Sequence, residues 1–450
     1  MVIPSKGDED SSFTVSVNED VGKTVRGKLW TRQEKKQWSI ALFMGCSALY
    51  ACRTVMPLCV MAISKDLEWD KTESGTVLSS FFWGYTLTQF LGGYLSDRIG
   101  GDVILPIAAT LWSLLTFWTP VLATLVSDKH MGITILVISR VMLGMCQGFH
   151  YPGFTSMIAK KVSEKERSFT YAFIAAGSHL GTLMCGSLGS LLLERYGWES
   201  AFYACGIGGL AWMLFVRYYL IGQYRQKYIP ELDSMVVAEK MAARPKEKTS
   251  SVPWLVLFAT PAFWSLIVGH FCQSNAFYIL LSWLPSYFHE NYPSAKGWVF
   301  NVVPWLVSIP SSIFSGWFAD HLISKGYSVT LVRKLMASIN LAGVALFLIL
   351  LTYTTTYASS LFCMAMCICC SGFHNSGIAV NPQDIAPGSA GSVFGIMNMA
   401  GAIPGFVGVY MAGHILEATH SWNAVFNQTA MVCLFGWVVY SLFGTAKKIV

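Results

Sequence analysis

Two arginines stand inside long apolar stretches of the sequence, where a charged side chain is costly. Arg53 follows Ala-Leu-Tyr-Ala-Cys, and Arg140 follows Ile-Leu-Val-Ile-Ser. An arginine at the centre of a bilayer costs about 3 kcal/mol on insertion scales, and its guanidinium stays protonated there. Each of the two must therefore face a polar cavity or a partner group.

The sequence offers no carboxylate as that partner. Every Asp and Glu falls in a predicted tail, loop or helix end, and Asp384 comes closest to a helix interior. We therefore predict a net positive cavity, and the paired N–H groups of arginine suit a phosphate or a carboxylate. A cation transporter would place acids here instead. The alternative is a structural role, in which Arg53 and Arg140 bond to helix carbonyls or to neutral side chains.

Neutral polar and aromatic side chains accompany the arginines. Gln147 stands seven residues after Arg140, so both project from the same face of one helix. Gln273 stands near the position that corresponds to Arg53 in an internal repeat. We therefore expect one positive and one neutral wall, suited to a bulky cargo with an anionic end and an uncharged ring. The candidate binding residues are Arg53, Arg140, Gln147, Tyr50, Tyr151, Gln273, Asn275, His374 and Asn375.

A second group of residues predicts a gate. The pattern Gly93-x-x-x-Asp97-Arg98-x-Gly100 lies between the second and third apolar segments, and Gly316-x-x-x-Asp320 echoes it. The glycine lets two helices approach closely, and the aspartate can pair with a cation or a helix N-terminus across the gate. The alternative is a solvated turn.

Apolar segments of membrane-spanning length must position these residues. The 450 residues are 54% hydrophobic and 12% charged, about half the charged fraction of a soluble domain, which excludes a water-soluble helical protein. Hydropathy predicts twelve membrane helices. Their ranges are 37–63, 74–95, 103–126, 131–158, 168–193, 199–221, 261–288, 294–322, 330–352, 356–381, 389–416 and 422–446.

The predicted helices fall into two halves with polar segments around them. We expect a disordered cytosolic tail at 1–36, a six-helix half at 37–221, a cytosolic linker at 222–260, a second six-helix half at 261–446 and a short cytosolic tail at 447–450. Lys and Arg gather on the side that holds both termini, which predicts that both termini are cytosolic. The exceptions on the other side are Lys65, Lys71, Lys129, Arg195 and Lys296.

A near-constant offset relates the two halves. Gly148-Phe-His150 recurs as Gly372-Phe-His374, and the same offset of 224 residues recurs at other glycines and at a tryptophan. An even number of helices per half gives both halves the same orientation. The pattern therefore predicts a parallel repeat about an axis along the membrane normal.

Other classes of function find no support in the sequence. The cysteines fall mostly inside apolar segments, for example Cys363 and Cys367, which favours packing over a metal site. No phosphate-binding loop, nucleophile elbow or zinc-binding helix appears, so we expect no enzyme, cofactor, metal or nucleic-acid partner. The expected partners are the lipid bilayer and a small anionic substrate, and the protein is expected to be a monomer.

The gate motif and the arginines carry a family resemblance. Residues 93–101 resemble the signature loop of the major facilitator superfamily. The stretch Ser79-Ser-Phe-Phe-Trp-Gly-Tyr85, with Arg53 and with Arg140 followed by Gly144, is similar to the anion-transporter family of vesicular glutamate transporters, sialin and sodium/phosphate cotransporters. The similarity runs from about residue 37 to residue 446 and implies an all-α membrane protein with the major facilitator fold.

Within that family, residues 281–285, 296–305, 332–336 and 381–384 are most similar to the nucleotide carriers. The resemblance implies a secondary active transporter that works by alternating access. It implies that ATP, and also ADP and GTP, move from the cytosol into secretory or synaptic-type vesicles, or across a lysosomal membrane. It further implies a lumen-positive membrane potential as the driving force, chloride as an activator, and Arg53 and Arg140 as the residues that bind the phosphates.

The departures from the family pattern are informative. Relatives that couple to protons or carry glutamate have a glutamate where Gln147 stands, and glutamate carriers have an arginine at Gln273 and a histidine at Leu78. The resemblance therefore argues against proton symport and a small dicarboxylate cargo. Two alternatives remain: an organic-anion or phosphate cotransporter of the plasma membrane or lysosome, which sodium dependence would favour, and an anion channel, which would conduct without saturable exchange.

Overall fold

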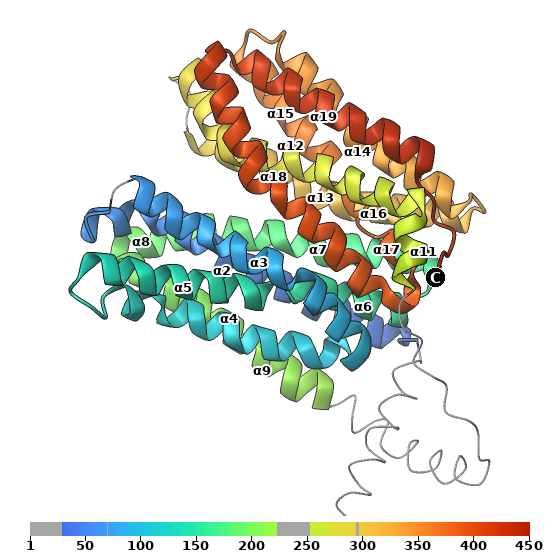
Figure 1. Cartoon of the computed structure of the whole chain (residues 1–450), viewed down its shortest axis with the longest axis horizontal. Coiled ribbons are helices and arrows are strands. Elements are labelled where there is room, and N and C mark those ends of the chain that lie inside the picture. The colour runs from blue at the N-terminus through green and yellow to red at the C-terminus, as the bar shows by residue number, and fades with distance from the viewer. Residues whose placement is uncertain (1–28, 70, 223–252, 294–296) are drawn as a thin grey trace, which may run out of the picture.

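The computed structural model describes residues 29–69, 71–222, 253–293 and 297–450, and these ranges contain helices and no strand (Figure 1). The first half holds α2 (Arg32–Asp66), α3 (Lys71–Ile99), α4 (Gly101–Ala123), α5 (Lys129–Gln147), α6 (His150–Lys161), α7 (Arg167–Met184), α8 (Ser190–Tyr196) and α9 (Trp198–Leu214). The second half holds α11 (Trp254–Ala259), α12 (Pro261–Asn291), α13 (Gly297–Ser324), α14 (Val329–Leu351), α15 (Tyr357–Ser371), α16 (His374–Gly377), α17 (Pro382–Ile385), α18 (Ala390–Thr419) and α19 (Trp422–Phe443).

The helices identify a multi-pass membrane protein. Each of the twelve predicted spans overlaps a described helical segment, and eight of these segments are long and apolar enough to cross a membrane. The spans outside that set correspond to α3, α7 with α8, α12 and α13. Of these, α3, α7 and α13 pack against the opposite half, so part of their surface faces protein rather than lipid.

The contacts between helices confirm the parallel repeat. In the first half α2 packs on α7, α3 on α5 and α4 on α9, and in the second half α12 packs on α18, α13 on α15 and α14 on α19. The pairs between halves are also equivalent, because α3 packs on α18 as α13 packs on α7. Figure 1 shows the two halves as separate bundles that come together at one end.

The repeated Gly-Phe-His triplet marks a break in one helix of each half. Two predicted spans, 131–158 and 356–381, are each interrupted here: α5 ends before Gly148, and α15 ends before Gly372. A Cβ atom at Gly372 would lie 2.6 Å from the hydroxyl of Ser311 on α13, and Gly148 meets Thr88 of α3 in the equivalent way. Glycine is therefore required for the close approach, and hydropathy does not reveal the break.

The first helix begins earlier than predicted, at Arg32 instead of residue 37. The backbone N–H of Glu34 donates to the Thr31 hydroxyl at 3.3 Å, and the Thr31 N–H donates to the Glu34 carboxylate at 2.9 Å. This capping box satisfies two N–H groups that the helix start would otherwise leave free. Trp30 stacks on Trp38, so the prediction of a disordered tail is wrong for residues 29–36. The rest of that tail, 1–28, lies outside the described residues.

Both ends of the described chain pack at one end of the bundle, which we call the terminal end. The Trp30 N–H donates to the carbonyl of Lys161 at 2.9 Å, and the Ile449 N–H donates to the carbonyl of Ile385 at 2.7 Å. The short tail predicted at 447–450 is therefore held against the second half. Most of the predicted linker, residues 223–252, falls outside the described residues, and α11 follows it.

Gly144 provides a test of this packing. A Cβ atom there would meet the carbonyl of Phe81 and lie 2.8 Å from the backbone nitrogen of Tyr85, because α5 and α3 cross in direct contact. We expect Gly144→Val to destabilise the protein by about 3 kcal/mol, since the two backbones cannot separate without breaking the half. Thermal unfolding in detergent measures this. Gly208→Val is the control, because Gly208 has no atom within 4 Å of an added Cβ; equal melting temperatures for the two variants would contradict the packing.

Candidate functional site

A cavity lies between the two halves near the middle of the bundle. The empty space between its lining atoms is about 1000 Å³, including the part open to solvent. The first half contributes Tyr50, Arg53, Tyr85, Tyr151, Tyr171, Ala175, Ser178 and His179. The second half contributes His270, Gln273, Ser274, Phe277, Tyr278, Leu280, Ser308, Ile368, Ser371, Gly372, His374, Asn375, Ala379, Phe394 and Asn398.

Arg53 carries the charge of this cavity. The described residues that line the cavity include no Asp, Glu or Lys and no other Arg. Its guanidinium carbon lies 4.6, 5.0 and 4.5 Å from the ring centres of Tyr50, Phe81 and Tyr85. Each such contact is worth about 0.5–2 kcal/mol, more when water is excluded. The rings therefore offset the cost of burying the cation and leave its charge in place, whereas a carboxylate partner would neutralise that charge.

Gln147 orients Arg53. The Arg53 Nε–H donates to Gln147 Oε1 at 3.0 Å, and the amide of Gln147 donates to the carbonyl of Leu49 at 3.3 Å. Gln147 is fully buried and is not on the cavity wall. The nitrogen Nη2 of Arg53 is buried without a hydrogen-bond partner. The guanidinium is thus held from one side and retains donors for a ligand.

Arg140 contacts the ring of Phe81, which Arg53 also contacts. Its guanidinium carbon is 5.3 Å from the centre of the Phe81 ring, whose centre also lies 5.0 Å from Arg53. Arg140 is 3% exposed, is absent from the cavity wall, and its Nε has no hydrogen-bond partner. In the described part of the chain neither arginine has a carboxylate within ion-pair distance. The predicted excess of positive charge is confirmed for these residues.

The wall from the second half is neutral. Gln273 is 5% exposed and its Oε1 has no hydrogen-bond partner, whereas Asn375 donates to the hydroxyl of Ser312 at 2.8 Å. His374 also lines the cavity. Asn275 does not, because its amide oxygen points at Gly408 of α18. The structure therefore brings Tyr50, Arg53, Tyr151, Gln273, His374 and Asn375 together and leaves Arg140, Gln147 and Asn275 off the wall.

Several lining residues were not singled out by sequence reasoning. Two of them, Tyr85 and Asn398, lie on α3 and α18 among ordinary apolar residues, so neither charge nor spacing distinguished them. The available signal for Tyr85 is that it stands four residues after Phe81, which puts both rings on one face of α3.

The gate motif joins the two halves at the terminal end. Asp97, near the end of α3, accepts hydrogen bonds from the backbone N–H of Gly391 at 3.1 Å and of Ser392 at 2.8 Å, and from the Ser392 hydroxyl at 2.7 Å. These N–H groups belong to the first turn of α18, so the carboxylate caps the positive end of that helix dipole. The predicted contact with a helix N-terminus is present. Gly93 is required because its backbone touches Gly391.

The repeat builds an equivalent latch on the other side. Asp320 of α13 accepts from the backbone N–H of Ser168 at 3.2 Å and of Phe169 at 2.8 Å, the first turn of α7. A Cβ at Gly316 would lie 2.7 Å from the Cα of Phe169. Of the other motif residues, Gly100 has φ 106°, a conformation that favours glycine, and Arg98 lies over the ring of Tyr94. We call the contact of Asp97 with α18 and the contact of Asp320 with α7 the paired latches.

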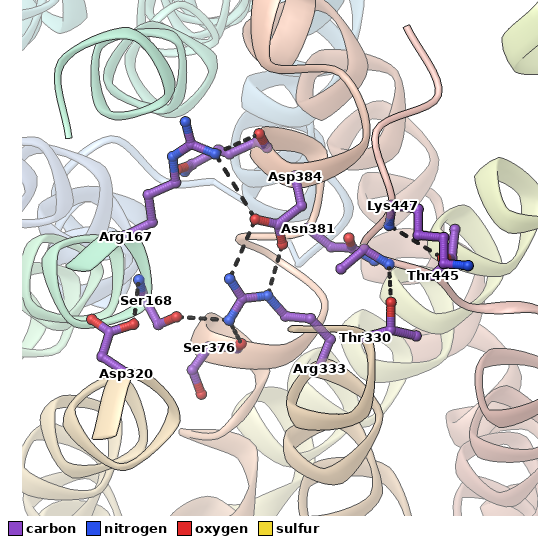
Figure 2. A network of polar contacts seen from close by, with 12 residues as sticks. Arg167, Ser168, Asp320, Thr330, Arg333, Ser376, Asn381, Asp384, Thr445 and Lys447 are labelled. Carbon is purple, nitrogen blue, oxygen red and sulfur yellow. Dashed lines mark hydrogen bonds and ion pairs between the residues drawn. The ribbon is translucent and has the colours of Figure 1, made fainter. Parts of the chain in front are cut away.

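A buried ion pair between the latches was missed by sequence reasoning. Figure 2 shows Arg333 of α14 between Asp384, Ser168 and Ser376. Its Nε donates to Asp384 at 2.8 Å, and its Nη1 donates to the Ser168 hydroxyl at 2.7 Å and to the Ser376 carbonyl at 3.0 Å. Arg167 stands 4.0 Å from the same carboxylate. The Asp384 carboxylate therefore pairs with Arg333 at the terminal end and does not line the cavity.

No metal or disulfide complicates this picture in the described residues. They contain no group of three or more His, Cys, Asp or Glu side chains placed to hold a metal ion. All twelve cysteines are free thiols, most of them buried.

Comparisons with known proteins agree with this architecture. The family model for the Major Facilitator Superfamily matches residues 41–409. The voltage-gated purine nucleotide uniporter SLC17A9 of Homo sapiens is 44% identical over 421 residues, 93% of this chain and 94% of that protein. The probable anion transporter 4, chloroplastic, of Oryza sativa subsp. japonica is 34% identical over 438 residues, 95% of this chain and 72% of that protein. The solved structure of the proton:xylose symporter XylE bound to 6-bromo-6-deoxy-D-glucose has a TM-score of 0.71 at 14% identity, covers 93% of this chain and 98% of that one, and shows the fold alone.

The latch geometry predicts a local effect of Asp97→Ala. The change removes three acceptors from the start of α18, and hydrogen bonds to a charged group are worth about 1.5–3 kcal/mol each. We expect the amides of Gly391 and Ser392 to exchange with deuterated solvent at least about tenfold faster, as measured by hydrogen-exchange mass spectrometry. Asp102→Ala is the control, because Asp102 stands in the first turn of α4 and the hydrogen bonds to Gly391 and Ser392 come from Asp97. Unchanged exchange at the start of α18 would show that the latch does not hold the halves together.

Proposed function

The chain belongs to the anion transporters of the major facilitator superfamily, and we propose that it carries purine nucleotides across the membrane of an intracellular vesicle. That family consists of transporters, so the protein is not an enzyme. The cargo and its destination are our proposal, supported by the cavity and by the similarity to the human purine nucleotide uniporter.

One observation carries the proposal: the cavity has a caged, unneutralised arginine on one wall and neutral groups on the other. Arg53 retains a free N–H nitrogen at Nη2, and Gln273 across the cavity retains a free acceptor at Oε1. A nucleotide matches this arrangement, because its phosphates need cationic donors and its base carries both donors and acceptors. Inorganic phosphate would leave the neutral wall unused.

The two arginines take different roles in this proposal. Arg53 contacts the phosphates directly, since it lines the cavity. Arg140 acts through its positive potential, because it is buried and does not line the cavity in this conformation. Gln147 is a positioning residue for Arg53. A carboxylate at the position of Gln147 would pair with the guanidinium and cancel the charge that attracts the cargo.

Membrane voltage is sufficient to drive such a cargo. Moving one charge through 100 mV is worth about 2.3 kcal/mol, so a cargo of charge −4 gains about 9 kcal/mol. That free energy corresponds to a concentration ratio of about a million if transport is fully coupled. A lumen-positive potential therefore suffices, and no carboxylate on the cavity wall is needed to carry a proton.

The fold supports alternating access as the mechanism. The paired latches and the pair Arg333–Asp384 close the terminal end, and we propose that their release opens the cavity to that side. Lysines and arginines gather there, which supports a cytosolic terminal end with both chain termini in the cytosol. A secretory-vesicle or lysosomal membrane, a monomeric state and activation by chloride complete the proposal on family resemblance.

Uptake of radiolabelled ATP into proteoliposomes tests the proposal. We expect an inside-positive potential to drive accumulation, and we expect Arg53→Ala to reduce it by at least about a hundredfold because the direct phosphate ligand is lost. Arg140→Ala is expected to reduce uptake as well. Arg217→Ala is the control, because Arg217 lies in the helical segment Phe215–Leu220 that follows α9 and does not line the cavity.

The outcomes separate the alternatives. Accumulation of phosphate but not ATP, with a requirement for sodium, would establish an ion-coupled phosphate or organic-anion cotransporter instead. Conductance without saturation would establish a channel. Normal ATP uptake by Arg53→Ala would refute the assignment of the binding site.

Gln273 tests the neutral wall separately. We expect Gln273→Leu to weaken ATP binding about threefold to tenfold, the loss of one hydrogen bond, and to leave the binding of inorganic triphosphate unchanged. Competition against labelled ATP with the purified protein measures both. Asn275→Leu is the comparison, because Asn275 does not line the cavity. Equal loss of ATP and triphosphate affinity in Gln273→Leu would show that this wall does not contact the base.

A further inference from the structure

Two histidines on the neutral wall form a hydrogen-bonded chain that the proposed function does not use. His270 Nδ1 lies 3.0 Å from His374 Nε2, and His270 Nε2 lies 3.2 Å from Asn398 Oδ1. At the other end His374 Nδ1 lies 3.5 Å from Asn340 Nδ2. His270 is 7% exposed, and both imidazoles line the cavity.

The neighbours of this chain fix its proton positions. The amide nitrogen of Asn398 donates to the Tyr85 hydroxyl at 3.1 Å and to Gln89 Oε1 at 3.0 Å, so its oxygen must accept from His270 Nε2–H. A neutral His270 then has a bare Nδ1, which accepts from His374 Nε2–H. The Nδ1 of His374 is bare in turn and accepts from Asn340. Both histidines are therefore satisfied as neutral Nε2–H tautomers.

The same chain can accept one further proton without losing a hydrogen bond. Asn340 Oδ1 has no hydrogen-bond partner among the described residues. If the Asn340 amide turns over, His374 can shift its proton to Nδ1 and donate to that oxygen. Its Nε2 then accepts from Nδ1–H of a doubly protonated His270. A second proton would place two N–H groups and two positive charges against each other, so it is strongly disfavoured.

We propose that His270 and His374 form a binding site for a single proton on the cavity wall, and that this proton adds to the charge of Arg53 to strengthen the hold on an anionic cargo. The second part rests on the proposed function, whereas the first does not. The ligand of the new site is the proton itself.

The internal repeat supplies a comparison within the same molecule. The offset of 224 residues relates His374 to His150 and His270 to Cys46. The contact is kept, because His150 Nε2 lies 3.6 Å from the sulfur of Cys46. The equivalent of Asn398 is Ile174, which cannot accept a hydrogen bond. The first half therefore has the same framework without the second imidazole or its acceptor, and the proton site belongs to the second half alone.

The surrounding groups leave the added charge uncompensated. Helices α11, α13, α14, α18 and α19 pack against α12, which carries His270, and α7, α13 and α14 pack against α16, which carries His374. Helix α3 reaches the pair through the hydrogen bond between Asn398 and Tyr85. Arg53 is the charged group that faces the cavity, and Arg333 and Asp384 pair with each other two turns along α14 from Asn340. The other titratable side chains that line the cavity or are buried near it are Tyr50, Tyr85, Tyr151, Tyr171, His179, Tyr278, Cys370, Cys433 and Tyr440.

Histidine nitrogen NMR of the purified, ligand-free protein tests the proton site directly. We expect the pair to gain one proton between pH 8 and pH 5. The signal is assigned to the pair if it is lost in His270→Cys, a substitution chosen because cysteine occupies the equivalent position, Cys46, in the first half. His374→Gln removes the other imidazole and is the second variant should His270→Cys fold poorly. If both imidazoles remain neutral at pH 5, or if both become charged, the single-proton site is refuted.

The effect on cargo is measured as ATP affinity at pH 7.5 and pH 5.5. ATP titrates in the same way for every protein variant, so the ratio of wild-type to variant affinity isolates the contribution of the pair. We expect this ratio to rise about tenfold on acidification for His270→Cys, the effect of one added charge near the ligand. His414→Gln, an exposed histidine of α18, is the control and should retain the wild-type dependence.

The two proposals fail in different ways. A constant ratio would show that the proton does not act on the cargo, and loss of the pH dependence in His179→Gln instead would place the site at another histidine of the wall. If the wild-type protein does not bind ATP, the proposed function fails, and the NMR titration still decides whether the pair holds a proton.

Discussion

The structure depends on keeping positive charge unneutralised in its interior. Arg53 is stabilised by three aromatic rings and one neutral amide, which lower the cost of burial and leave the charge in place. This constraint extends to the placement of acids. Asp97 and Asp320 cap helices, and Asp384 pairs with Arg333, so each described acid near the interface between halves has its own partner at the terminal end. Since none reaches the cavity wall, the field at Arg53 remains available for a ligand.

Duplication gave both halves one framework, and the chemistry diverged at a few positions. The paired latches are nearly identical, with Ser168 and Ser392 related by the offset of the repeat. The cavity walls are not. Cys46 contacts a histidine in the first half, whereas His270 contacts one in the second. By the same offset Phe277 is the equivalent of Arg53 in the second half, and Gln273 stands one turn before Phe277. The latches are thus symmetric between the halves, whereas the side chains that line the cavity are not.

The sequence was sufficient for the fold and for the charge of the site, because both follow from strong penalties. Apolar length, Lys and Arg placement and the repeat gave the helices, and the cost of a buried arginine singled out Arg53. The latches were also predictable, since a glycine and an aspartate at fixed spacing have few uses at a helix end. Details set by packing were not. Arg53 lines the cavity and Arg140 does not, although both stand inside apolar segments, and hydropathy does not distinguish the two.

The buried pair Arg333–Asp384 was missed for a related reason. Arg333 stands near the start of a predicted helix, where an arginine is usually solvated, and its partner lies 51 residues further along the chain. Only the fold brings α14 and α17 together. The histidine pair was equally hidden, because a single imidazole in a membrane helix is most often a partner for a neighbouring helix. What distinguishes it is the chain of acceptors on both sides, which is visible only in three dimensions.

One helix connects the two ends of this arrangement. α18 presents Gly391 and Ser392 to the latch of Asp97 and, two turns later, presents Asn398 to the histidine pair and to Tyr85. An α-helix rises 1.5 Å per residue and is stiff over such a length, so these groups are fixed about 9 Å apart. In the proposed function, a movement of α18 that released the Asp97 latch would therefore also displace Asn398 from the histidine pair and from Tyr85.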